Sequence, residues 1–129
     1  MSPEYRRQSA AHTLQRILDG GDPWVALGQF LDDWRSEGID RRAGLIADPP
    51  AEVEGIFVRW AALLAAAVDC LCAADGRAAP AWVRRSEYRL PEPWFLYPGW
   101  RLRAWQLAET PVPFRMRNIF GGDRILSRV

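Results

Sequence analysis

The stretch AEVEGIFVRWAALLAAAVDCLCAAD, residues 51–75, decides the fold that the sequence predicts. Its apolar residues recur at spacings of three and four, which places them on one stripe of a helix. Pro50 stands at the first turn and Gly76 directly after the end, the usual start and stop of a helix. Small residues fill the opposite side, and a helix that is apolar on more than one side is normally buried. The stripe consists of Val53, Phe57, Trp60, Leu64, Val68 and Leu71, and the small residues are Ala61, Ala62, Ala65 and Ala66.

Shorter helical patterns flank this segment, over residues 3–19, 23–37 and 100–109, with short turns near the C-terminus. Residues 88–99, YRLPEPWFLYPG, hold three prolines and four aromatic residues, so they predict an extended segment with its rings inserted into the helices. We therefore predict an all-α fold. Residues 1–129 form one compact helical bundle around the 50–75 helix, and the Pro- and aromatic-rich segment packs on it.

Charge is unevenly divided along the chain. Every basic residue is Arg, which pairs with carboxylate or phosphate through a planar fork. Residues 1–75 hold 7 Arg and 12 acidic residues, a net charge of −5, and residues 76–129 hold 10 Arg and 4 acidic residues, a net charge of +6. This asymmetry indicates either an acidic half that docks on a basic half or a basic surface kept for an anionic partner.

The sequence predicts neither catalysis nor a cofactor. The one histidine, His12, lies in a helical pattern without a Ser, Cys or Asp arranged around it as a catalytic site requires. Cys70 and Cys72 are two apart in a helix, where they point to different faces and cannot share a metal ion, so we expect two buried thiols. The longest uncharged run in the central helix, residues 60–68, is shorter than the about 20 residues of a membrane span. We therefore predict a cytoplasmic protein without a metal site or a membrane partner.

The C-terminal third combines arginines with aromatic residues. Such a combination can form a protein–protein interface, because Arg and aromatic side chains dominate binding energies there. It can also bind nucleic acid by neutralising phosphates and stacking on bases. In a third interpretation the rings are core and the arginines are solvated or paired with the acidic half. The residues that we predict to contact a partner are Phe114, Arg115, Arg117, Phe120, Arg101 and Arg103.

A family resemblance covers residues 75–129. The motifs that carry it are DGRAAPAW at residues 75–82, PEPWF at residues 91–95 and TPVPFRMRNIF at residues 110–120. They resemble the C-terminal module of a group of small bacterial antitoxin-like or regulatory proteins. In that group the module often follows a helix-turn-helix domain, and the genes tend to lie beside genes of nucleotidyltransferase-like toxins.

The resemblance implies an antitoxin-like or regulatory protein whose partner is a protein, with a toxin-like nucleotidyltransferase or a second copy of the chain as the candidates. Residues 1–48 depart from the group, because the Trp-rich and acidic helix after Pro23 is unlike a recognition helix for the major groove. We therefore predict a non-catalytic protein that binds a partner protein through its C-terminal third. The alternative is an accessory protein that binds nucleic acid with the same arginines.

Overall fold

The computed structural model describes residues 7–128, and α-helix dominates this range. The all-α prediction is confirmed, with one small addition, a parallel pair of two-residue strands. The α-helices are α1 (Ala10–Leu18), α2 (Pro23–Ser36), α3 (Ala43–Ile46), α4 (Phe57–Ala74), α5 (Arg103–Glu109), α6 (Val112–Arg115) and α7 (Ile125–Arg128). The strands are β1 (Trp94–Phe95) and β2 (Ile119–Phe120), and the 3-10 turns are η1 (Ile39–Arg41), η2 (Ala81–Arg84), η3 (Ser86–Tyr88) and η4 (Gly122–Arg124).

The first two helices begin at side-chain caps. The Ser9 hydroxyl accepts a hydrogen bond from the His12 amide at 3.1 Å, so α1 begins at Ala10 rather than at residue 3, and residues 3–6 of the predicted helix lie outside the described range. The Asp22 carboxylate accepts from the amides of Trp24 at 2.8 Å and Val25 at 3.2 Å. α2 follows this cap directly with proline at its first position, and it begins at residue 23 as predicted.

The central helix α4 begins seven residues later than predicted, at Phe57 instead of Pro50. The reason is Gly55, whose φ of +62° is left-handed and incompatible with a right-handed helix. Residues 51–54 are irregular and leave Val53 outside the helix, although it still packs against the core. From Ala61 to Val68 every residue is buried, which agrees with a helix that is apolar on more than one side.

Other elements enclose α4 on several sides. α1, α6, η2 and η3 pack directly on it. By length and mean hydropathy α4 could also cross a membrane, but the core helix of a soluble protein meets the same criteria. Ten of its residues are buried against the rest of the chain.

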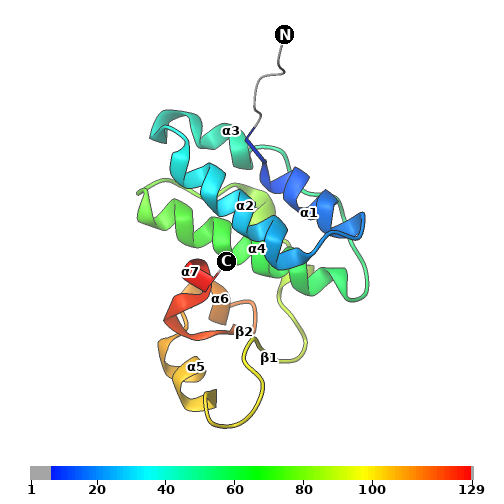
Figure 1. Ribbon diagram of the computed structural model, residues 1–129, viewed down its shortest axis with the longest axis vertical. Coiled ribbons are helices and arrows are strands. Elements are labelled where there is room, and N and C mark those ends of the chain that lie inside the picture. The colour runs from blue at the N-terminus through cyan, green and yellow to red at the C-terminus, as the bar shows by residue number, and fades with distance from the viewer. Residues whose placement is uncertain (1–6, 129) are drawn as a thin grey trace.

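Residues 94–128 form a C-terminal lobe at one end of the long axis of the molecule (Figure 1). Its base is the strand pair, in which Trp94 is aligned with Ile119 and Phe95 with Phe120. Of the extended segment predicted for residues 88–99, Trp94 and Phe95 form a strand, whereas Tyr88 ends the 3-10 turn η3 and bends interrupt the rest. The pairing with residues 119–120 is not part of the prediction. Trp94 packs edge-to-face on Trp60 of α4 with 5.1 Å between ring centroids, and this contact joins the lobe to the helical layer.

Two buried polar side chains hold the lobe together. Gln106 accepts a hydrogen bond from the Tyr97 amide at 3.0 Å and donates one to the Tyr97 carbonyl at 3.1 Å. The Thr110 hydroxyl accepts from the amides of Gly121 at 3.1 Å and Gly122 at 2.9 Å, and it donates to the Gln106 carbonyl. These bonds fix α5 against the turn that follows β2. α5 itself begins at Arg103, three residues later than predicted.

Candidate functional site

The segment FRMRNIF, residues 114–120, is divided between the core and the surface. Phe114 has none of its surface exposed and Arg117 only 4%. The two residues are three apart in the chain and share the face of this turn that packs on α4. The prediction that Phe114 and Arg117 contact a partner is therefore wrong, because neither side chain is accessible.

Arg117 instead joins three parts of the chain. Its guanidinium donates to the Asp69 carboxylate of α4 at 3.2 Å, to the Val83 carbonyl at 2.8 Å and to the Pro113 carbonyl at 2.6 Å. Burial lowers the pKa of Arg117 below its ordinary value, and the hydrogen bond and charge of Asp69 act in the opposite direction. Arg117 is thus part of the structure that positions the surface residues around it.

The other predicted contact residues are wholly or partly accessible. Arg101, Arg103 and Arg115 are exposed. Phe120 is half-buried and stacks on Phe95 with 5.2 Å between ring centroids. The guanidinium of Arg103 lies over the ring of Phe95 in β1, 4.4 Å from its centroid.

The most exposed aromatic side chain of the lobe is one that the sequence analysis did not select. Trp100 is 79% exposed at the turn before α5, and the apolar side chains of Leu102 and Leu107 are exposed on the same short segment. A Trp directly after Pro98-Gly99 is the signal that could have found it, because this dipeptide marks a turn and turns lie at the surface. We call the exposed set the lobe tip; it consists of Trp100, Arg101, Leu102, Arg103 and Leu107.

A hollow of about 410 Å³ borders the lobe tip. Tyr97, Leu102 and Trp105 supply its apolar walls, and Asp123 and Arg124 supply its polar edge. The lobe tip and the hollow therefore form one continuous surface with apolar and cationic groups in contact.

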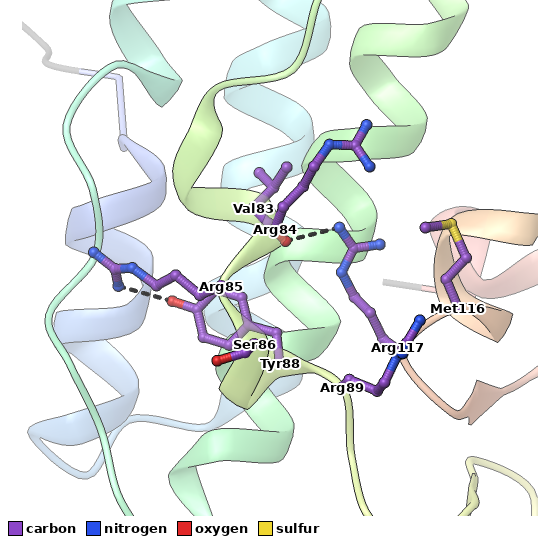
Figure 2. A pocket seen from close by; sticks show the side chains of 8 residues that line it. All are labelled: Val83, Arg84, Arg85, Ser86, Tyr88, Arg89, Met116 and Arg117. Atoms are coloured by element: carbon purple, nitrogen blue, oxygen red, sulfur yellow. Dashed lines mark hydrogen bonds between the residues drawn. The ribbon is translucent and has the colours of Figure 1, made fainter.

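A second cavity lies between the turns after α4 and the end of α6. It has a volume of about 350 Å³, and we call it the arginine pocket (Figure 2). Arg85 donates to the Tyr88 hydroxyl at 3.0 Å and to the Pro50 carbonyl at 2.9 Å. Burial raises the pKa of Tyr88 above its ordinary value. The lining residues are Val83, Arg84, Arg85, Ser86, Tyr88, Arg89, Met116 and Arg117.

His12, Cys70 and Cys72 line neither the hollow beside the lobe tip nor the arginine pocket. His12 is exposed on α1. Cys70 and Cys72 are free thiols; burial raises the pKa of Cys70 to about 12 and also raises the pKa of Cys72, which makes both poor nucleophiles at neutral pH. Among residues 7–128 there is no group of three His, Cys, Asp or Glu side chains that could hold a metal ion.

Comparison with known proteins adds no relative. No family model, no curated protein and no solved structure matches the chain.

Proposed function

We propose that this protein is a non-catalytic interaction protein, regulatory in the manner of an antitoxin, that binds a partner protein through the lobe tip. The observation that carries the proposal is Trp100, 79% exposed and followed by the exposed Arg101 and Arg103. Leaving apolar surface in water costs about 25 cal/mol per Å², which a partner's pocket would recover. Trp and Arg are also the residue types that contribute most to binding energy at interfaces.

The rigidity of the lobe supports this proposal. Gln106 in the middle of α5 and Thr110 directly after its end hold this helix through hydrogen bonds to Tyr97, Gly121 and Gly122. The turn that carries Trp100 is closed by a hydrogen bond from the Arg103 amide to the Trp100 carbonyl at 3.2 Å. A surface that is ordered before binding loses less conformational entropy in the complex, so more of the contact energy remains as affinity.

The lobe tip defines the chemistry of its partner. The partner offers an apolar pocket for the indole of Trp100 and carboxylates near Arg101 and Arg103. The resemblance described above implies a nucleotidyltransferase-like toxin, which would place the complex in the cytoplasm. A second copy of this chain is the other protein candidate, because residues 1–75 carry a net charge of −5.

Single-stranded nucleic acid is the second candidate. One observation favours it: an exposed indole can stack on a base while Arg101 and Arg103 neutralise the adjacent phosphates. Salt separates the two functions. Phosphate neutralisation gives a steep loss of affinity as salt is added, whereas a largely apolar protein interface responds weakly.

The experiment begins with tagged protein recovered from its native cells with and without nuclease. A captured protein is then purified and titrated against the full chain at two salt concentrations. Trp100→Ala combined with Arg101→Gln is expected to weaken binding by about 30-fold or more, as loss of a hot spot does. Sedimentation of the protein alone detects self-association.

The matched control is Ile39→Ala combined with Arg41→Gln. Both of these residues are exposed on η1, which packs beside α3 at the opposite end of the long axis from α5 (Figure 1). The control also removes one exposed apolar side chain and one exposed arginine, and we expect it to change affinity less than about threefold. Equal affinities of the two variants would contradict the lobe tip as the site, and recovery of nucleic acid alone would favour the second candidate.

A further inference from the structure

The arginine pocket holds more positive charge than the chain itself neutralises. Four of its eight lining residues are arginines and none is acidic. In the described part of the chain the only carboxylate that forms an ion pair with any of them is Asp69, at 3.2 Å from Arg117 and 4.0 Å from Arg84. One carboxylate beside four guanidinium groups leaves a surplus of positive charge at the cavity.

Two further carboxylates lie in the neighbourhood, and neither enters the pocket. Glu87 belongs to η3, and Glu52 lies in the irregular stretch before α4. Both are exposed, and their charges raise the pKa of Tyr88. They therefore reduce the positive potential from outside without occupying the cavity.

The four arginines differ in how much hydrogen-bonding capacity they have left. Arg117 and Arg85 are committed to carbonyl, carboxylate and hydroxyl partners of the chain. Arg84 has 63% of its side chain exposed and only the long contact to Asp69. Within residues 7–128 the guanidinium of Arg89 and the hydroxyl of Ser86 have no hydrogen-bond or ion-pair partner.

Figure 2 shows Arg85 apart from the other three arginines. Arg85 extends to the left, toward Tyr88, whereas Arg84, Arg89 and Arg117 lie on the other side of the view, where Met116 is also seen. An anion held by the two uncommitted arginines would thus be close to the buried charge of Arg117.

We propose that the arginine pocket binds the phosphate group of a small phosphorylated molecule. The planar forks of Arg84 and Arg89 match phosphate oxygens bidentately, and the Ser86 hydroxyl supplies a further donor. A phosphate monoester carries nearly two negative charges at neutral pH, so it can neutralise a surplus of more than one positive charge. The volume of about 350 Å³ falls within the range of small-molecule sites, and the exposed Met116 offers an apolar wall to the rest of the ligand.

This site is independent of the proposed function. The arginine pocket is built from η2, η3 and the end of α6, and it shares no lining residue with the lobe tip. Loss of one activity by mutation can therefore be measured while the other is retained.

The test is isothermal titration of the full chain at constant ionic strength with four probes. Inorganic phosphate, AMP and glucose 6-phosphate carry the group, and adenosine lacks it. We expect the three phosphate-bearing probes to bind and adenosine not to bind. Tighter binding of AMP than of glucose 6-phosphate identifies a nucleotide as the source of the phosphate, and the reverse order identifies a sugar phosphate. The absence of binding by all three phosphate probes would overturn the proposal.

The decisive variant is Arg84→Gln/Arg89→Gln, because both side chains are exposed and their loss leaves the core intact. We expect affinity for the phosphate probes to fall by about tenfold or more, the loss of charged hydrogen bonds. The control Arg41→Gln/Arg115→Gln removes the same charge from exposed positions outside the pocket and should change affinity less than about twofold. Equal losses in the two variants would show a general effect of net charge and would refute a site.

Discussion

Arg115 and Arg117 stand two positions apart at the end of α6, and their environments are opposite. Arg115 is exposed, whereas Arg117 is buried with Asp69 and two carbonyl groups. Removing one member of a buried ion pair leaves the other charge without compensation, which costs about 3–5 kcal/mol. We therefore expect Arg117→Ala to lower the free energy of unfolding by about 3 kcal/mol in urea denaturation.

Arg115→Ala is the matched control, and its expected effect on unfolding is below about 0.5 kcal/mol, as for other exposed substitutions. The opposite ranking of the two variants would mean that Arg117 does not join α6 to α4. The two measurements also distinguish a structural arginine from an accessible one, although the two arginines are only two residues apart in the sequence.

Gly122 is a position where the turn requires glycine for two reasons. Its φ is +75°, and a Cβ atom there would overlap the ring of Trp105. We expect Gly122→Ala to destabilise the protein by about 3 kcal/mol, from left-handed backbone strain of about 1–2 kcal/mol together with overpacking. The measurement is urea unfolding followed by tryptophan fluorescence.

Gly76→Ala measures the backbone-strain part of that effect alone. Gly76 has a similar φ of +68°, but a Cβ atom there would meet nothing within 4 Å. Its substitution should cost only the backbone strain of about 1–2 kcal/mol. If the two variants unfold at the same denaturant concentration, the contact between Gly122 and Trp105 contributes nothing.

At the scale of elements, Thr110 holds the end of α5 to the turn after β2. Thr110→Val keeps the shape of the side chain but leaves the buried amides of Gly121 and Gly122 without an acceptor. We expect a loss of about 2–4 kcal/mol of unfolding free energy and faster hydrogen exchange at these two amides.

Thr110→Ser retains the hydroxyl and should restore the protection of both amides, with a cost below about 1 kcal/mol. Slow exchange of Gly121 and Gly122 in the valine variant would mean that the strand pair alone fixes this turn. Such a result would also remove the main argument for a lobe tip that is ordered before binding.

The helices differ in how far local sequence determines them. α2 is predictable at its start because Asp22 and Pro23 form its cap and first turn within adjacent residues. The start of α4 is not, because an apolar spacing continues through Val53 although Gly55 has a left-handed backbone. A glycine inside a helical pattern is compatible with either outcome, and only the packing of the flanking chain decides between them.

The lobe is less predictable than the helical layer because its contacts join distant residues. The pairing of Trp94 with Ile119 and the bonds from Gln106 to Tyr97 have no periodic signature in the chain. The same distinction between contacts of neighbouring residues and contacts of distant residues applies to the candidate sites. The spacing of three between Phe114 and Arg117 could have indicated a shared buried face, whereas the cavity between η3 and α6 requires the tertiary structure.

For the whole molecule, the acidic and basic halves meet at α4. Asp69 pairs with Arg117, and Asp75 contacts Arg77 at 3.6 Å in addition to pairing with Arg42 of its own half at 2.9 Å. Arg77 and Arg117 of the second half therefore neutralise acidic residues of the first half, as the interpretation of an acidic half docked on a basic half expects. Other arginines of the second half are exposed; they include Arg84, Arg89, Arg101 and Arg103.

Stability at alkaline pH should depend on the partly buried thiol of Cys70. The pKa of Cys70 is raised from 9.0 to about 12, so folding favours the neutral thiol. Its contribution is complete below pH 9 and is lost as the pH rises toward 12. We expect the melting temperature to fall over this window, and Cys70→Ala to fall less steeply. Parallel curves for the two proteins would contradict a thiol that folding keeps neutral.

The contact of Trp60 with Trp94 has a spectroscopic consequence. Trp60 also meets Trp24 of α2 edge-to-face, with 5.4 Å between centroids, so three indoles form a row from α2 through α4 to β1. Detachment of the lobe would separate only the second pair, whereas global unfolding would separate both. Near-ultraviolet circular dichroism of the coupled indoles therefore distinguishes a lobe that opens on an intact helical layer from a chain that unfolds as one unit.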